Sequence, residues 1–270
     1  IDEGQTDQVE VDEFVDQAEK KLFEISQNKK RSGFVSTAEL ATETIKIIET
    51  LTTRKMAITG IASGFKKLDK MTAGFQNSDL IIIAARPGMG KTSFSLNIVM
   101  HAGLVHGLKV GFFSLEMAKE QLMMRMLSAK SKLNFGKIRT GFLSDSEFQK
   151  TVAAAESLQR ANIFIDDTPA LTSLDLRSRT RRLKSDKGID ILVVDYLQLM
   201  RGSSRTDNRE REIAEISLSL KALAKELQIP IIAISQLSRQ TEARTDKKPQ
   251  LSDLRESGAL EQDADMVIFL

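Results

Sequence analysis

The stretch AARPGMGKT, residues 84–92, constrains the fold of this chain more than any other feature. It directly follows the apolar run Leu80–Ile83, and a pattern typical of a helix comes after it. Gly88 and Gly90 allow the backbone to turn so that successive N–H groups point at the oxygens of a phosphate. The N-terminus of the following helix faces the same anion. A strand, a glycine-rich turn and a helix in this order predict a phosphate-binding loop in an α/β fold.

Two side chains at the end of this loop carry its chemistry. Lys91 can reach the β- and γ-phosphates of ATP, and the Thr92 hydroxyl can bind Mg²⁺. Ala85 stands where such loops usually have their first glycine. We expect it to be tolerated, because this position needs a small residue more than a special backbone dihedral. The sequence therefore predicts a site for ATP and Mg²⁺, with the nucleotide bound by Arg86, Pro87, Gly88, Met89, Gly90, Lys91, Thr92 and Ser93.

Six apolar runs alternate with helical patterns or loops along most of the chain. Buried strands that are almost continuously Val, Ile or Leu, and that alternate with helices, are typical of parallel sheets covered on both faces. We therefore predict an α/β fold with a mostly parallel, twisted sheet flanked by helices. The six expected strands are LIIIAA, KVGFFSL, NIFIDD, IDILVVDYL, IPIIAIS and DMVIFL.

The first 33 residues predict a separate segment. Apolar residues recur there at three- and four-residue steps, so they share one face of a helix, and the polar run at residues 28–33 reads as a linker. Ser36 and Glu39 form a capping box for a second helix, expected to run to about Thr52. We expect a linker helix and joining segment at 1–33 and the main domain at 34–270. The apolar face of the first helix either packs on its own domain or docks on a neighbouring subunit.

The composition is that of an ordinary globular protein, with 28% charged and 41% hydrophobic residues. A net charge of +2 means that any nucleic-acid site must be a local patch. The sequence has no cysteine and only two histidines, which argues against thiolate or histidine metal sites. No apolar stretch reaches the ~20 residues of a membrane span, and the acidic start does not resemble a signal peptide, so we expect a cytoplasmic protein.

Polar residues follow three of the expected strands, at the edge where open α/β sheets bind ligands. Glu116 could polarise the water that attacks the γ-phosphate, or could simply lie at the N-terminus of the next helix. Asp195 follows four apolar residues, as expected of a carboxylate that holds Mg²⁺. Gln236 could contact the γ-phosphate and report its loss to the loop that follows, although that loop also reads as an ordinary surface loop. We predict Lys91, Glu116 and Gln236 as catalytic residues, and Thr92 and Asp195 as metal ligands.

Two further polar stretches are candidates for contact with nucleic acid. Before the last strand, Arg255, Glu256, Ser257 and Gly258 could hold a phosphodiester through backbone amides and a guanidinium, without reading base sequence. We predict this stretch as a contact for single-stranded DNA. The basic run LRSRTRRLK, residues 176–184, is most simply a solvated helix face, with contact to DNA or to a subunit as the alternative.

The residues so far predict an ATP hydrolase on a RecA-like sheet. Five longer segments indicate which family of such hydrolases the chain resembles. They closely resemble the C-terminal motor domain of the DnaB-type replicative DNA helicases of bacteria or phages, over roughly residues 55–270. The segment before them resembles that family's linker helix and joining segment, with the N-terminal collar domain missing. The five segments are GFKKLDKMTAGFQNSDLIIIAARPGMGKTSF, FFSLEM, VVDYLQLM, ISQLSR and LSDLRESGALEQDADMVIFL.

The resemblance implies a homohexameric ring that moves 5′ to 3′ on single-stranded DNA at the replication fork, with primase and a helicase loader as partners. It also implies that nucleotide binds between subunits and that the first helix packs on an adjacent subunit. Residues that match the family's motifs take its roles: Lys91 and Thr92 for phosphate and magnesium, Glu116 as catalytic base, Asp195 as metal carboxylate, Gln236 as γ-phosphate sensor and residues 255–258 as the central DNA-binding loop. The scarcity of aromatic residues, thirteen Phe, one Tyr and no Trp, agrees with a grip on the phosphate backbone.

One part of the family's site has no counterpart in the sequence. Its arginine finger lies on a later hairpin with a K-x-R step, beyond Leu270, so we expect the C-terminal end to be missing here. Two alternatives to a helicase remain at this point. A RecA/RadA-type recombinase would share the sheet and the placement of Glu116. A nucleotide-switched assembly or loading factor would not need Glu116 and Gln236.

Overall fold

The computed structural model describes residues 34–54, 57–202, 209–238, 246 and 248–270. The chain divides into two compact units, Ile1–Thr59 and Gly60–Leu270. The predicted linker helix and joining segment at 1–33 lie outside the described residues. The second unit begins at Gly60, whereas the sequence analysis started the main domain at residue 34, so the boundary at 33/34 stays a prediction.

The described part of the first unit is one helix, α2 (Thr37–Arg54). It begins where the capping box was predicted, because the Ser36 hydroxyl accepts a hydrogen bond from the N–H of Glu39 at 3.3 Å. Threonine hydroxyls along the helix donate to the carbonyl four residues earlier, as Thr50 does to Lys46. The helix runs two residues beyond the predicted end at Thr52.

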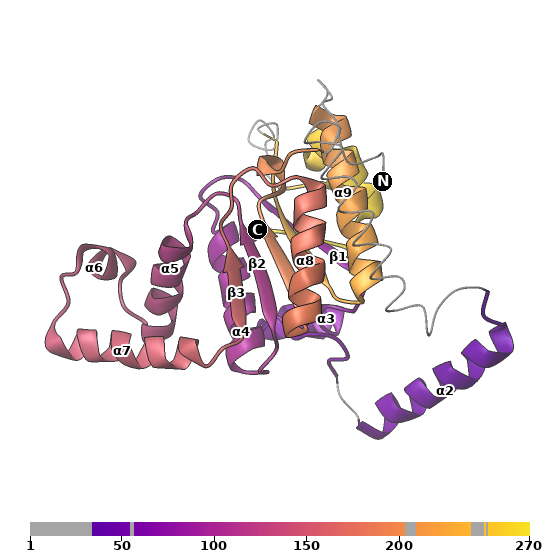
Figure 1. The fold of residues 1–270 in the computed structure, drawn as a ribbon, viewed down its shortest axis with the longest axis horizontal. Coiled ribbons are helices and arrows are strands. Elements are labelled where there is room, and N and C mark those ends of the chain that lie inside the picture. Colours follow the sequence, from indigo (N-terminus) through magenta and orange to yellow (C-terminus); the bar gives the residue numbers. More distant parts are fainter. Residues whose placement is uncertain (1–33, 55–56, 203–208, 239–245, 247) are drawn as a thin grey trace, which may run out of the picture. The chain divides into compact units, whose positions relative to one another are not determined.

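The second unit is built on a six-stranded sheet, and every strand lies where an apolar run predicted one (Figure 1). The strand order is β3-β2-β4-β5-β1-β6, and all five pairings are parallel. The prediction of a parallel α/β sheet is therefore confirmed. The strands are β1 (Leu80–Ala85), β2 (Val110–Ser114), β3 (Ile163–Asp166), β4 (Ile191–Asp195), β5 (Ile231–Gln236) and β6 (Met266–Phe269).

Helices cover both faces of the sheet, since parallel strands need helical crossovers. Figure 1 shows α8 and α9 on one face and α4 on the other. The helices of this unit are α3 (Lys66–Thr72), α4 (Lys91–Leu104), α5 (Lys119–Ser131), α6 (Phe135–Thr140), α7 (Asp145–Gln159), α8 (Ser173–Lys187), α9 (Arg209–Leu227) and α11 (Gly258–Asp263), with short 3₁₀ helices η2 (Leu197–Leu199) and η3 (Leu251–Ser257).

The central strands β1, β2 and β4 are buried along their whole length, which explains their near-continuous apolar sequence. Alternate strand residues point to opposite faces. Ile81, Ile83 and Phe112 pack with α4 and α5 residues in one core cluster. This double-sided burial fixes the carboxyl ends of β1, β2, β4 and β5 next to one another, and the predicted site residues lie there.

The basic helix α8 is not the solvated face that its sequence favoured. Arg181 is only 4% exposed and donates to Glu226 of α9 at 2.6 Å, and Arg177 donates to the same carboxylate at 2.8 Å. Burial alone would raise the pKa of Glu226, but these two arginines lower it. Arg182, by contrast, is exposed as predicted, with its side chain 85% accessible. The sequence pattern of α8 did not show this pairing, because the partner carboxylate, Glu226, lies 45 residues further along the chain than Arg181.

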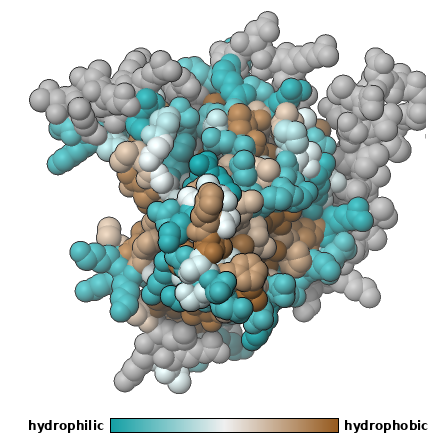
Figure 2. All heavy atoms as spheres, turned by 90° about the vertical axis from the view of Figure 1, so that its left-hand side faces the viewer, coloured by the Kyte–Doolittle hydropathy of each residue, from teal (hydrophilic) through white to brown (hydrophobic). Residues whose placement is uncertain are grey.

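Helices α5, α6 and α7 form a small bundle that projects from one end of the sheet (Figure 1). Figure 2 turns this side of the molecule to the viewer and shows apolar side chains among polar ones on its surface. Phe142 and Phe148 are 81% and 56% exposed, and Met123 of α5 is 41% exposed. The Met-rich helix α5 is therefore only partly a core helix, because it buries Met126 but exposes Met123 and Met124.

Candidate active site

The glycine-rich loop lies between β1 and α4, as the sequence predicted. Gly88 and Gly90 have φ angles of +79° and +88°, in the left-handed region that favours glycine. A Cβ atom at either position would meet nothing within 4 Å, so the backbone dihedral, not space, requires glycine there. Ala85 is fully buried as the last residue of β1 and has no positive φ, which explains why alanine is tolerated.

Thr92 and Asp195 meet at the start of α4. The Thr92 hydroxyl donates a hydrogen bond to Oδ2 of Asp195 at 2.7 Å, although the two residues are 103 positions apart. The other carboxylate oxygen, Oδ1, is buried and has no hydrogen-bond partner among the described residues. A hydroxyl next to an unpaired carboxylate oxygen fits Mg²⁺, which prefers oxygen ligands and keeps several waters. No group of three or more His, Cys, Asp or Glu side chains elsewhere in the described part of the chain could hold a metal.

The electrostatics of this corner are unusual. The pKa of Asp195 is raised to about 6, chiefly by burial and also by the negative charge of Glu116, although Thr92, Lys91 and Arg125 lower it. Burial also lowers the pKa of Lys91, whose Nζ lies 5.0 Å from the centre of the Tyr196 ring. The site thus holds a buried carboxylate whose charge is poorly compensated by the protein, as expected where a cation binds.

A cavity of about 370 Å³ opens beside this pair. Glu116 lies two residues beyond β2, and Ser114 of β2 pairs with Asp195 of β4, which places Glu116 near Asp195. Gln236, the last residue of β5, also lines the cavity. The cavity is lined by Pro87, Gly88, Gly90, Lys91, Thr92, Ser93, Glu116, Met117, Arg125 and Gln236.

Two of the predicted nucleotide-binding residues are placed differently. Arg86 donates from Nη1 to the carbonyl of Leu237 at 2.9 Å, so its guanidinium joins the loop to the segment that follows β5. Met89 is 59% exposed at the tip of the loop. Both roles in nucleotide binding stay predictions, and neither residue is among those that line the cavity.

Arg125 of α5 is a cavity residue that no sequence motif indicated. Its side chain lines the cavity, its Nε is buried without a hydrogen-bond partner in the described structure, and its guanidinium lies over the Phe135 ring at 5.0 Å. Its positive charge also lowers the pKa of Asp195. The available signal was its place in the helix directly after Glu116, where the helix must pass the end of β2.

The predicted DNA-contact stretch spans the junction of two helices. Arg255, Glu256 and Ser257 end η3, and Gly258 begins α11. Their side chains lie outside the described structure, so their contact with DNA stays a prediction. The backbone before them is joined to the candidate site, because the N–H of Ser238 donates to the carbonyl of Asp253 at 3.1 Å.

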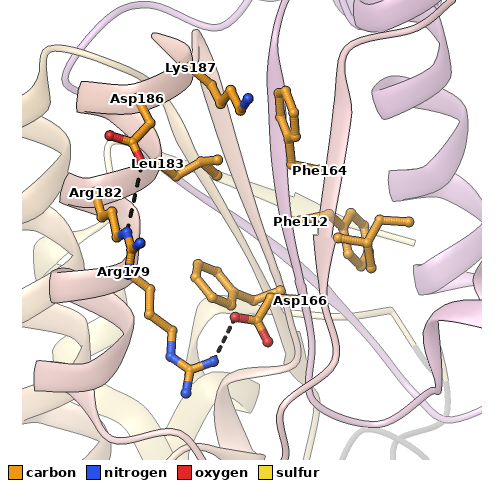
Figure 3. A pocket seen from close by; sticks show the side chains of 10 residues that line it. Phe112, Phe164, Asp166, Arg179, Arg182, Leu183, Asp186 and Lys187 are labelled. Atoms are coloured by element: carbon orange, nitrogen blue, oxygen red, sulfur yellow. Dashed lines mark hydrogen bonds and ion pairs between the residues drawn. The ribbon is translucent and has the colours of Figure 1, made fainter.

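A second hollow of about 250 Å³ lies between α8 and the edge strand β3 (Figure 3). Apolar residues such as Phe164 and Leu183 line it, and its two acidic residues are already paired. Asp166 accepts from Arg179 at 2.8 Å, and Asp186 lies 3.7 Å from Arg182. None of the predicted catalytic or metal-binding residues lines this hollow. The cavity at the glycine-rich loop is therefore the candidate active site.

Within the described residues, no helix has both the length and the apolar character needed to cross a membrane.

Comparison with known proteins agrees with this geometry. Residues 60–270 match the family model described as "DnaB-like helicase C terminal domain". The chain is 49% identical over 269 residues to "Replicative DNA helicase DnaB" of Geobacillus stearothermophilus, and 48% identical over 269 residues to "Replicative DNA helicase DnaC" of Bacillus subtilis (strain 168). Each match covers 99% of this chain but 59% of the relative, so the chain spans about three fifths of their length.

Solved structures give the same relation. One that is described as an "ATPase Domain" superposes with a TM-score of 0.82 at 39% identity, over 88% of this chain and 84% of that one. "The Structure Of A DnaB-Like Replicative Helicase And Its Interactions With Primase" gives 0.78 at 36% identity, over 94% and 60% of the two chains. The predicted RecA-like fold and the resemblance to DnaB-type helicases are thus both confirmed. The chain belongs to the family of DnaB-like helicase C-terminal domains.

Proposed function

We propose that this chain is the motor part of a replicative DNA helicase, which hydrolyses ATP with Mg²⁺ and uses the energy to move along single-stranded DNA. The observation that supports this best is the meeting of Thr92 and Asp195 at the glycine-rich loop, with Glu116 and Gln236 on the same cavity. Family membership supports the same activity. The two bacterial relatives described above are both helicases, so neither favours a recombinase or a loading factor.

In the proposed mechanism, different residues of the cavity bind the phosphates, hold the metal and activate the attacking water. Backbone N–H groups of the loop and the Lys91 ammonium bind the phosphate oxygens, while Thr92 and Asp195 hold the metal. Mg²⁺, when bound there, neutralises charge that develops on the β- and γ-phosphates. Glu116 orients a water and accepts its proton as the water oxygen bonds to the γ-phosphorus and the bond to the ADP oxygen breaks. Arg125 adds positive charge from within the same subunit.

Gln236 is the proposed sensor of the γ-phosphate. Its segment is tied to both the loop and the DNA-contact stretch, through Arg86 on one side and the Ser238–Asp253 hydrogen bond on the other. Loss of phosphate at Gln236 would therefore shift the backbone that leads to residues 255–258. We propose that this shift moves the DNA, 5′ to 3′, past the subunit.

The proposed assembly is a homohexamer with nucleotide bound between subunits and with an arginine supplied by the neighbour. The exposed apolar side chains of α5–α7 support it, because exposed apolar side chains that gather on one part of a surface mark contact with another protein. We further propose single-stranded DNA, primase and a helicase loader as partners, in the cytoplasm. One relative's structure is described in terms of its interactions with primase, which supports that partner.

A matched pair of variants tests the catalytic assignment. Glu116→Gln keeps the shape of the side chain but cannot accept a proton, so we expect kcat to fall by about 10²–10⁴-fold. The affinity for ATP should stay within about twofold, because the loop is unchanged. Glu120→Gln, on an exposed position in the first turn of α5, is the control and should hydrolyse ATP at the normal rate. Equal rates for Glu116→Gln and the unaltered chain, with single-stranded DNA present, would refute the assignment.

A further inference from the structure

The pairing between β4 and β5 ends short of the active site. The last register pair is Val194 with Ala233, whereas β5 continues to Gln236. On its other side β5 stays paired with β1 as far as Ala85 and Gln236. On the β4 side, therefore, no strand residue of the described structure pairs with the end of β5, where the proposed sensor lies.

The side chain of Gln198, in η2, takes the place of the missing strand residue. Its Oε1 accepts a hydrogen bond from the N–H of Gln236 at 3.2 Å, and its Nε2 donates to the carbonyl of the same residue at 3.3 Å. A neighbouring strand would offer the same two groups, one acceptor and one donor. Nε2 also donates to the hydroxyl of Ser235 at 2.9 Å. One side-chain amide thus forms with Gln236 the pair of hydrogen bonds that a neighbouring strand would form. We call this pair the side-chain rung.

Gln198 is itself held from α9. Its backbone carbonyl accepts from Nη2 of Arg209, the first residue of α9, at 2.7 Å, and Nη1 of Arg209 donates to the carbonyl of Met200 at 3.3 Å. Arg209 forms an ion pair with Glu212, which also accepts from the N–H of Gly202 at 2.6 Å. The segment that carries Gln198 is therefore fixed to the first turn of α9 independently of Gln236.

Gln198 also lies only three residues after Asp195. The proposed metal ligand and the support of the proposed sensor therefore belong to one short segment, fixed at one end by β4 and at the other by Arg209. A displacement of Gln236 cannot occur without breaking or moving its bonds to Gln198.

We propose that Gln198 is a positioning residue: it holds Gln236 in register with Asp195 at the phosphate site and links the movement of Gln236 to the first turn of α9. This rests on the proposed function, since the position of Gln236 matters for turnover only if the cavity hydrolyses ATP. The role is distinct from that of the cavity residues, because Gln198 acts through Gln236 and is not among the residues that line the cavity.

A double-mutant cycle on the full-length protein tests the proposal. Gln198→Leu keeps the approximate volume and removes all three bonds, so we expect kcat for DNA-stimulated ATP hydrolysis to fall about tenfold. The Kd for ADP should change less than about twofold, because the glycine-rich loop is untouched. If Gln198 acts through Gln236, the double variant Gln198→Leu/Gln236→Ala will be no slower than Gln236→Ala alone. Asp186→Asn, on an exposed position of α8, is the control and should behave as the unaltered chain.

A second variant provides a readout that a purely structural role would not move. Gln198→Glu keeps an acceptor for the N–H of Gln236 but turns a carboxylate oxygen towards its carbonyl. Protonation restores a donor there, so the kcat of this variant relative to the unaltered chain should rise as pH falls from about 8 to about 6. This measurement keeps the proposal testable even if Gln198→Leu does not fold.

The outcomes separate the two proposals. Three results would each overturn the role of Gln198 while leaving ATP hydrolysis established. The kcat of Gln198→Glu relative to the unaltered chain could stay constant with pH. The kcat of Gln198→Leu could equal that of the unaltered chain, or the losses of kcat in the two single variants could multiply in the double variant. Full-length unaltered protein that hydrolyses no ATP with Mg²⁺ and single-stranded DNA would instead refute the proposed function. Loss of kcat without loss of ADP affinity, together with non-additivity, supports the positioning role.

Discussion

Single residues at the cavity illustrate how far chemistry can be inferred from sequence. Strand-end positions identified Glu116, Asp195 and Gln236, because parallel strands bring their carboxyl ends to one edge. The structure brings all three to one corner with Lys91 and Thr92, as the order of motifs led us to expect. Arg125 could not be inferred in the same way, since the direction of a helix past the sheet decides which of its side chains reaches the cavity.

Asp195 gives a prediction about stability. Its pKa in the folded chain is about 6, above the ordinary value of 3.8, mainly because it is buried. The folded state therefore binds the proton more tightly than the unfolded state, and the contribution of Asp195 to stability falls as pH rises from about 4 through about 6. A shift of this size corresponds to about 3 kcal/mol at neutral pH.

Asp195→Asn removes this charge while keeping an oxygen for the Thr92 hydroxyl. We expect the variant, free of nucleotide and metal, to be more stable than the unaltered chain by about 1–3 kcal/mol at about pH 8, and the gain to vanish near about pH 4. ATP hydrolysis should be lost, since Mg²⁺ loses its carboxylate. Urea unfolding at several pH values checks the gain, with the surface variant Asp186→Asn as control. If the variant were less stable than the unaltered chain at the higher pH, this would contradict the inference that the buried charge of Asp195 destabilises the folded chain.

Among the elements, the strands were more predictable than the helix contacts. A strand that is buried on both faces is almost continuously apolar, so each of the six apolar runs identified its strand. The sequence of helix α8 does not show which of its residues are buried, because their partner Glu226 lies on α9. The end of β5 was likewise unpredictable, since the rung formed by Gln198 depends on how η2 turns after β4.

Neighbouring arginines on α8 provide the prediction at this scale. Arg181→Ala removes a buried partner of Glu226, and we expect it to lower the free energy of unfolding by about 2–3 kcal/mol. Arg182→Ala removes only an exposed pair with Asp186 and should cost less than about 0.5 kcal/mol. Chemical denaturation of both variants measures the difference. Equal losses would mean that the contact between α8 and α9 contributes little to stability.

The candidate site, taken within a single chain, carries little positive charge for a ligand as anionic as ATP. Among the described residues that line the cavity, Lys91 and Arg125 are the cationic ones. The proposed assembly adds an arginine from a neighbour. An arginine supplied by a neighbour could be predicted from the sequence only through the resemblance to a known family. No pattern within one chain shows which residues another copy contributes to its site.

If nucleotide is hydrolysed between subunits, activity per chain must depend on assembly. We expect the rate of ATP hydrolysis per chain to rise at least several-fold with protein concentration and to level off when rings are complete. Measuring rate and mass by light scattering over the same concentrations checks this. A rate per chain that stays constant while the protein is monomeric would show that one subunit is sufficient.

The side-chain rung at the end of β5 has a consequence for timing. Backbone rungs within a ladder open only with the strands that carry them, in collective motions of microseconds or longer. A glutamine amide can leave by rotation about its own side-chain bonds, without opening the strands beside it. We therefore expect the sensor end of β5 to be released and recaptured while the rest of the sheet keeps its register.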